Sequence, residues 1–163
     1  MQAGAPALVL AFRWKKRGLT MIPPSSSPPW ELHPQLDKDT TPLGELPLSR
    51  VLVMNDANYP WLLLVPRRPG IVELIDLNEP DRVQLMTEIA RVAGALKSVT
   101  ACDKLNIAAL GNVVPQLHVH IIARRTGDPA WPKPAWGAVP SRAYDADALD
   151  RFAAALRRLV RVE

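Results

Sequence analysis

Gln116-Leu-His-Val-His-Ile-Ile122 is the stretch that decides the fold. Its polar and apolar residues alternate, which is the pattern of a β-strand with one buried face. On such a strand the apolar side chains form one row that faces a core. The hydrogen-bonding side chains of Gln116, His118 and His120 form the other row, spaced roughly 7 Å apart. That second row must border a cleft or solvent, and we predict a strand over residues 116–124.

A row of this kind can carry out chemistry on a phosphate. A neutral imidazole is a nucleophile toward phosphorus, and a covalent nucleotidyl-histidine divides one difficult displacement into two easier steps. A second histidine and an amide beside it can donate hydrogen bonds to the charge that builds on the phosphate oxygens. His118, the middle member, is placed to attack. Ordinary solvent-facing strand histidines are the alternative interpretation of an isolated His-x-His pattern.

Upstream of this stretch, the sequence predicts three more strands. Two β-rich runs, 48–54 and 61–65, flank a six-residue turn cluster, which is the pattern of an antiparallel hairpin. Pro66 ends the second run, because proline has no N–H for the ladder. Residues 105–110 form another β-rich run, and residues 111–115 predict a tight connection into the histidine strand.

Two helices and one long loop complete the predicted fold. Asn78 and Pro80 are typical of a helix start, and apolar residues then recur at helical spacing to about residue 98. A second, amphipathic helix starts near Asp145. The segment 126–137 contains three prolines and two tryptophans, which excludes regular structure and predicts a loop.

The histidine stretch resembles the signature of the histidine-triad (HIT) family, His-φ-His-φ-His-φ-φ, where φ is apolar and the middle histidine is the nucleophile. Three other stretches extend the resemblance over roughly residues 30–137: Trp61-Leu-Leu-Leu-Val-Pro-Arg-Arg68, Asn106 through Gly111-Asn112, and Asn55-Asp56. Gln116 replaces the first histidine, and Pro69 stands where the family often has another. Since glutamine exchanges no proton near neutral pH, a leaving group would take its proton from His120 or water.

The resemblance implies an α+β, HIT-like fold: an antiparallel sheet of about five strands with one internal and one C-terminal helix. It implies a nucleotide hydrolase or nucleotidyl transferase acting at the α-phosphate through a nucleotidyl-histidine intermediate. The substrate would be a nucleotide conjugate, such as a dinucleoside polyphosphate, a phosphoramidate or an adenylylated molecule. It also implies a homodimer whose two sheets pair into one, and no required metal or other cofactor.

The same resemblance assigns roles to individual residues. The catalytic residues would be His118, His120 and Gln116, with Asn112 against the phosphate and Asn106 and Asp56 on the ribose side. Each of these asparagines and Asp56 also fits an ordinary turn or strand-end position. From its place after the histidine strand, the Pro/Trp loop is expected to cover the site, with Trp131 or Trp136 near the base or the leaving group.

Two other functions fit the same residues. With Gln116 in the triad, the chain could be a nucleotide-binding module with weak or no turnover. His-x-His on one strand face also chelates Zn²⁺ or Fe²⁺, but such a site needs a third ligand. The remaining histidine, His33, precedes the hairpin, so this ligand would be a carboxylate that the sequence does not identify.

Composition sets the broad class and the partners. The chain has 163 residues, of which 48% are hydrophobic and 22% charged, which is ordinary globular usage and fits one domain. The net charge of +4 comes from Arg13, Lys15, Lys16 and Arg17, because without these four the sixteen remaining bases equal the sixteen acids. A neutral body gives no reason to expect a specific nucleic-acid partner. The small-molecule nucleotide partner is what the resemblance to the HIT family implies.

The boundaries and the compartment follow from the same composition. We expect a Pro/Ser-rich basic leader at 1–28, the nucleotide-binding domain at 29–139, and a C-terminal helix at 140–163 packed on that domain. The apolar run 6–12 is too short to span a bilayer, and its basic cluster is on the wrong side for a signal peptide. The single cysteine, Cys102, allows no internal disulfide and fits a reducing cytoplasm.

Overall fold

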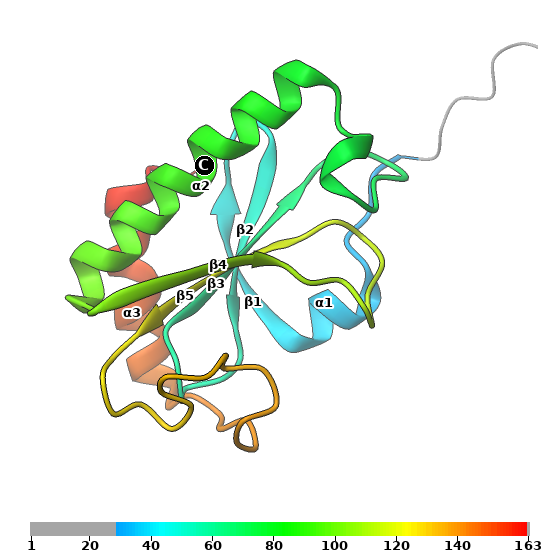
Figure 1. Cartoon of the computed structure of the whole chain (residues 1–163). Coiled ribbons are helices and arrows are strands. Elements are labelled where there is room, and N and C mark those ends of the chain that lie inside the picture. Colours follow the sequence, from blue (N-terminus) through cyan, green and yellow to red (C-terminus); the bar gives the residue numbers. More distant parts are fainter. Residues whose placement is uncertain (1–28, 163) are drawn as a thin grey trace, which may run out of the picture.

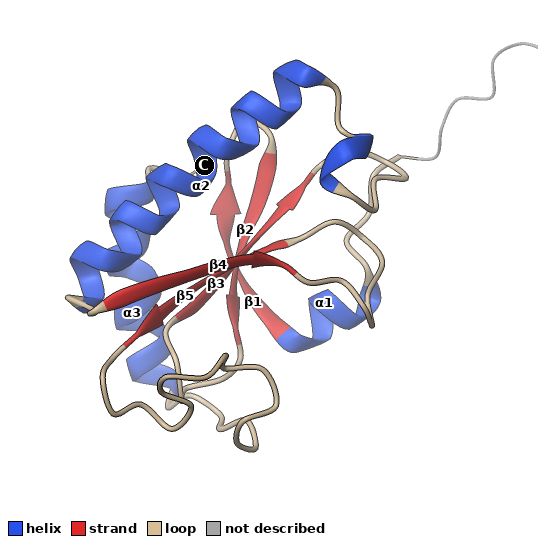
Figure 2. Cartoon of the chain, viewed as in Figure 1, coloured by secondary structure: helices blue, strands red, loops and turns tan. Residues whose placement is uncertain are grey.

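The computed structural model describes residues 29–162, so the predicted leader at 1–28 lies outside the described residues. The elements, in chain order, are α1 (Pro34–Asp39), β1 (Thr40–Glu45), β2 (Ser49–Met54), β3 (Trp61–Pro66), the 3-10 turn η1 (Leu74–Asp76), α2 (Glu79–Thr100), β4 (Lys104–Ala109), β5 (Val119–Arg124) and α3 (Ala146–Val160). Figure 1 shows their arrangement, and Figure 2 separates helices, strands and loops.

The strands form one five-stranded sheet in the order β1-β2-β3-β5-β4, and each neighbouring pair is antiparallel. Helices α2 and α3 cover one face, while α1 lies on the other (Figure 1). Alternation along β3 divides the core between these faces: Leu62 and Leu64 pack under α2 and α3, and Trp61 and Leu63 pack on the α1 side. The predicted α+β fold is confirmed.

Most predicted elements are present near their predicted limits. The hairpin is β2 with β3, and the two predicted helices are α2 and α3, with Asn78 and Asp145 as their N-caps. Their side chains accept hydrogen bonds from the N–H groups of Asp81 and Ala148. No helix in residues 29–162 is long and apolar enough to cross a membrane.

The histidine strand is shorter than predicted, since β5 begins at Val119 and not at Gln116. In the register of β3 with β5, Leu64 faces Val119, so Pro66 would face Leu117 and could donate no hydrogen bond to it. The N–H of Leu117 donates instead to the carbonyl of Ile71, at 3.0 Å. Gln116 and His118 therefore lie on the segment that enters β5, and only His120 is in the strand itself.

The sequence pattern does not predict α1 or β1. Strand β1 contains Pro42 and Gly44, both unfavourable in a strand interior, and its register with β2 shifts between them. An edge strand tolerates both residues, because one side of its ladder is unpaired. Helix α1 has six residues, too few for a periodic pattern to show.

Candidate active site

His118 and His120 lie together where β5 begins, on the sheet face opposite α2. Both are buried, with 5% and 4% of their surfaces exposed, and their ring centroids are 4.7 Å apart. The register explains the position of His120, which faces Leu63 of β3 and Ala108 of β4. The structure thus brings the two predicted histidines into edge-to-face contact, in an environment with little solvent.

One ring nitrogen of His118 is hydrogen-bonded within the protein, and the other is available to a ligand. Its Nδ1 lies 2.7 Å from the backbone oxygen of Gln116, and because a carbonyl only accepts, Nδ1 must carry the proton. The lone pair of the neutral ring is then on Nε2. Burial lowers the pKa of His118 below its ordinary value, outweighing the Gln116 bond, which raises it. His118 is therefore neutral near pH 7, with a nucleophilic lone pair.

Gly111 allows the loop before β5 to pack tightly beside His118. A Cβ added at Gly111 would lie 2.8 Å from the carbonyl oxygen of Val114 and 3.8 Å from Cε1 of His118. The first distance is a clash with backbone, which cannot move aside cheaply. Glycine is needed here for close approach, which gives a physical reason for the Gly-Asn pair noted in the sequence.

His120 has the opposite tautomer. Trp61 Nε1 donates to His120 Nδ1 at 3.0 Å, so Nδ1 is unprotonated and the single N–H of the neutral ring is on Nε2. That nitrogen lies 3.4 Å from the backbone oxygen of Leu110. Burial first, and the neighbouring His118 second, lower the pKa of His120 to about 4. At neutral pH His120 is uncharged: it can donate a hydrogen bond, but it has no extra proton to transfer as a general acid.

Two cavities meet at His118. One, of about 430 Å³, is mostly apolar; it is lined by Gln35, Leu36, Asp39, Met54, Leu110, Asn112, Val113, Val114, His118, His120 and Trp136. The other, of about 220 Å³, contains Glu73, Gly111 and Asn112 beside His118. A group bound at His118 would thus have room on two sides, one suited to an apolar ring and one more polar.

Of the three nucleotide-binding residues predicted from the family pattern, only Asn112 lines the cavities at His118, and it lines both. Asp56 lines an adjoining cavity of about 380 Å³, and its Oδ1 accepts from the N–H groups of Asn58 and Arg142 at 2.9 and 3.2 Å. Asn106 lines neither cavity at His118; its Oδ1 accepts from Arg124 Nη1 at 2.7 Å.

The side chain of Gln116 is hydrogen-bonded to the chain before α1. Its Oε1 accepts from the N–H of His33 at 2.9 Å, and its Nε2 donates to the carbonyl of Glu31 at 2.8 Å. His33, which the sequence offered only as a distant third histidine, is half-buried, and its Nδ1 accepts from the N–H of Gln35 as the N-cap of α1. The first position of the triad motif is therefore bonded to protein backbone.

The Pro/Trp loop contributes one of its two tryptophans to the site. Trp136 packs edge-on against His120 and Trp61, with centroid distances of 5.3 Å to each, and it lines the large cavity. Trp131 lies elsewhere, 39% exposed and over the guanidinium of Arg124 at 5.9 Å. Position after the histidine strand thus identified the loop correctly, but only packing distinguishes its two tryptophans.

Several residues of this site are not identified by the sequence pattern. Trp61, which fixes the tautomer of His120, had a signal: it begins a strand and shares alternation with Leu63, whose partner is His120. Gln35, Leu36 and Asp39 had none, because α1 was not predicted. Within residues 29–162, no group of three or more His, Cys, Asp or Glu side chains is arranged to hold a metal ion, and His33 does not supply a third ligand to the His118–His120 pair.

Comparison with known proteins identifies clear relatives. The model of the HIT domain family matches residues 35–127. The structure of a histidine triad protein from Bradyrhizobium japonicum is 65% identical and covers 82% of this chain and 99% of its own, with a TM-score of 0.81. That of a histidine triad (HIT) protein from Sinorhizobium meliloti is 43% identical, covering 80% and 96%, with a TM-score of 0.78. A histidine triad protein from Marinobacter aquaeolei is 42% identical, covering 82% and 97%, with a TM-score of 0.80. No curated protein matches the chain.

Proposed function

Because the chain belongs to the HIT domain family, we propose that it hydrolyses or transfers the nucleotidyl group of a nucleotide conjugate, with His118 as nucleophile. Family membership supports a nucleotide-binding, hydrolase or transferase role. One observation carries the finer proposal: the bond from His118 Nδ1 to the Gln116 carbonyl, at 2.7 Å, leaves the Nε2 lone pair free between two cavities. That is the state a nucleophilic imidazole needs.

The proposed first step forms a bond from His118 Nε2 to the α-phosphorus and breaks the bond from phosphorus to the leaving group, which departs with the electron pair. The imidazole becomes cationic, and the Gln116 carbonyl, already 2.7 Å from Nδ1, stabilises that charge. In the second step water, or another acceptor in a transfer reaction, displaces His118 from phosphorus and regenerates its neutral ring.

Contacts to the phosphate and the nucleoside are assigned by position. We assign phosphate contacts to the Nε2–H of His120 and to the amide of Asn112, since both line the cavity of His118. The base fits the apolar walls formed by Leu36, Met54 and Trp136. The ribose would reach Asp56 only across Asp39, Met54 and Trp136, which line both this cavity and the next.

Water is the proposed proton source for the leaving group. Burial holds the pKa of His120 near 4, so His120 carries no extra proton at pH 7. The sequence left His120 and water as alternatives, and this electrostatic argument favours water. Good substrates are then those whose leaving group departs without strong acid assistance.

The experiment that tests this proposal is intact-protein mass spectrometry after rapid quenching with a panel of adenylylated compounds. Wild type is expected to gain one nucleotidyl mass, and His118→Ala is expected to gain none while still binding AMP. We also propose that no metal is required, so protein treated with a chelator should form the same adduct at the same rate. An adduct that persists in His118→Ala would refute the assignment of the nucleophile.

A binding module without turnover is the second candidate. Two features favour it: the low pKa of His120 limits proton supply, and the Gln116 amide is hydrogen-bonded to backbone and not to a phosphate. Calorimetry with AMP beside the adduct assay separates the two functions. AMP binding with neither adduct nor released mononucleotide would establish the module.

We further propose a homodimer joined through β4. This strand is the edge of the sheet opposite β1, and it exposes Ile107, 48% accessible, on the face that carries α2. An unpaired, apolar sheet edge is a surface that a second copy can extend. We also propose a cytoplasmic location, because the single cysteine, Cys102, is a buried free thiol, as is usual in a reducing compartment.

A further inference from the structure

We propose that Gln116 is a positioning residue: its side-chain amide holds residues 31–33 in place and thereby fixes the α1 wall of the cavity at His118. This gives the altered triad position a role different from phosphate contact. The inference rests on the proposed function only in treating that cavity as the nucleotide site.

The contacts of the Gln116 amide are specific. The oxygen accepts from His33 N–H at 2.9 Å and the nitrogen donates to the Glu31 carbonyl at 2.8 Å, across 83 and 85 residues of chain. A primary amide presents its donor and its acceptor side by side, as a peptide group does, so it can bond two backbone groups of one extended segment at once. A glutamate has no donor for the Glu31 carbonyl.

The segment held by Gln116 leads directly into the cavity wall. His33 is the N-cap of α1, and Gln35, Leu36 and Asp39 of α1 line the cavity that contains both histidines. A helix of six residues is far below the length at which an isolated helix is stable. The position of α1 therefore depends on its anchors, which include the Gln116 amide at its start, buried Leu36, and the bond from the N–H of Asn55 to the carbonyl of Asp39 at its end.

Gln116 connects this wall to the nucleophile through a different part of the same residue. Its backbone carbonyl holds His118 Nδ1 at 2.7 Å, whereas its side chain holds residues 31–33. A substitution at 116 removes the side-chain bonds to residues 31–33 and keeps the backbone carbonyl that bonds His118. We therefore expect it to weaken substrate binding, raising KM, and to leave the attack by His118, measured as kcat, nearly unchanged.

The functional test uses variants on both sides of these hydrogen bonds. Gln116→Ala removes both bonds and Gln116→Glu removes the donor. His33→Pro removes the N–H donor at a backbone φ of −58°, which is already that of proline, and His33→Ala is its matched control, lacking the imidazole but keeping the N–H. KM is expected to rise at least about fivefold in Gln116→Ala and in His33→Pro relative to His33→Ala. The double variant Gln116→Ala/His33→Pro should have the same KM as Gln116→Ala, because that single variant already lacks both bonds.

Two results would overturn the proposal. A fall in kcat at unchanged KM in Gln116→Ala would mean that the amide acts on the phosphate in the transition state. Equal behaviour of His33→Pro and His33→Ala would mean that the N–H bond is irrelevant to substrate binding. If wild type forms no adduct but binds AMP, the same comparisons are made on the dissociation constant of AMP.

Hydrogen exchange tests the positioning role without any assumption about function. In wild type the amide of His33 is bonded to Gln116 Oε1, so it should exchange slowly; in Gln116→Ala, this amide and those of α1 should exchange at least about fivefold faster. In His118→Ala their protection should remain. Unchanged protection in Gln116→Ala would refute the role of Gln116 even in a protein that forms the nucleotidyl adduct normally.

Discussion

At the residue scale, the two histidines of the motif differ because of what each neighbour can donate or accept. The Gln116 carbonyl forces a proton onto Nδ1 of His118, whereas the Trp61 indole keeps Nδ1 of His120 unprotonated. The same side chain, two residues apart, therefore has an unprotonated Nε2 at position 118 and an Nε2–H donor at position 120. Sequence alternation indicated that both share a site but could not assign these states.

Burial of neutral His120 predicts a pH-dependent stability. The pKa of His120 is about 4 in the folded protein against 6.5 as its ordinary value, so between these pH values the unfolded chain binds more protons. Stability is then fully present above pH 6.5 and is lost as the pH falls toward 4. The shift corresponds to about 3 kcal/mol in the free energy of unfolding.

Urea unfolding at pH 7 and pH 4.5 measures this loss of stability. His120→Asn, which retains an acceptor for Trp61, should lose correspondingly less unfolding free energy between the two pH values. An equal loss in both proteins would contradict this prediction.

At the element scale, one buried and one partly exposed ion pair hold neighbouring segments in place. Arg124, 1% exposed, pairs with Asp128 through two bonds of 2.7 and 2.8 Å and also donates to the Lys133 carbonyl at 3.0 Å. These bonds hold the Pro/Trp loop so that Trp136 packs on His120. At the other end of the sheet, Arg68 is bidentate to Asp81 and joins the end of β3 to the start of α2. In the Pro-Arg-Arg stretch, Arg68 therefore has a structural role.

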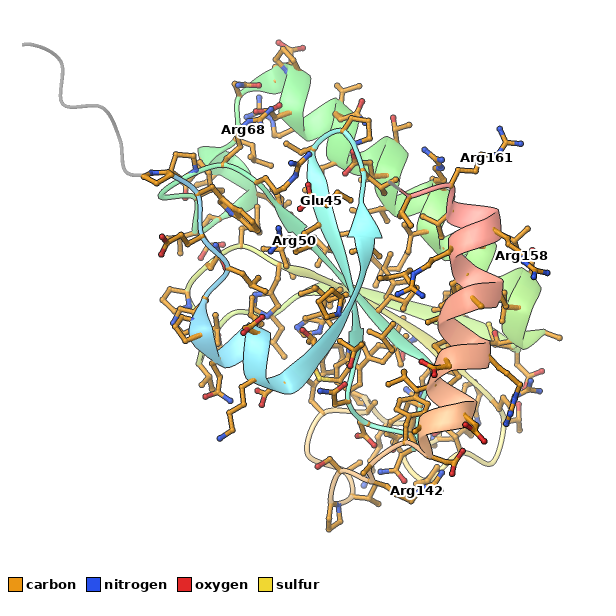
Figure 3. The ribbon with its side chains drawn as sticks, turned by 180° about the vertical axis from the view of Figure 1, so that it is seen from behind. Glu45, Arg50, Arg68, Arg142, Arg158 and Arg161 are labelled. Carbon is orange, nitrogen blue, oxygen red and sulfur yellow. The ribbon has the colours of Figure 1, made fainter. Side chains whose placement is uncertain are left out.

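Removing one partner of the buried pair should be costly. Asp128→Asn leaves the Arg124 guanidinium buried without its charge partner, and we expect a loss of about 3–5 kcal/mol in the free energy of unfolding. Glu45→Gln is the matched control. Glu45 pairs with Arg50 on the β1–β2 hairpin (Figure 3) and also with Arg67, but all three side chains are about one-third exposed, so the loss should cost about 1 kcal/mol or less for each pair. Chemical denaturation of both variants measures the difference, and similar losses would refute this account of the loop.

At the scale of the whole molecule, the two edges of the sheet are unlike. The β1 edge carries Pro42 and an irregularity before Gly44, features that discourage pairing with another strand. The β4 edge is regular over all six of its pairs with β5 and exposes Ile107. This asymmetry is the structural support for assembly through β4.

A charge on the β4 edge should separate the proposed dimer. Light scattering should give wild type a mass near twice 18.0 kDa and Ile107→Lys a mass near 18.0 kDa. Leu159→Lys is the matched control, because Leu159 is equally accessible, 50% against 48%, but lies on α3. A monomeric wild type, or a variant at Ile107 that stays dimeric, would refute the β4 interface.

What the sequence determined by itself is the part of the protein that depends on near neighbours in the chain. Alternation and helical spacing predicted the β2–β3 hairpin, α2, β4 and α3, and the motif singled out His118. The edge strand β1 and the short helix α1 were not predictable from the sequence, because local propensity is weak there and tertiary packing determines the secondary structure. Only the tertiary structure assigned partners across long separations: Gln116 with residues 31–33, Trp61 with His120, and Asn106 with Arg124. The reason is physical, since a polar side chain bonds whatever group folding brings within about 3 Å, and no local pattern encodes that encounter.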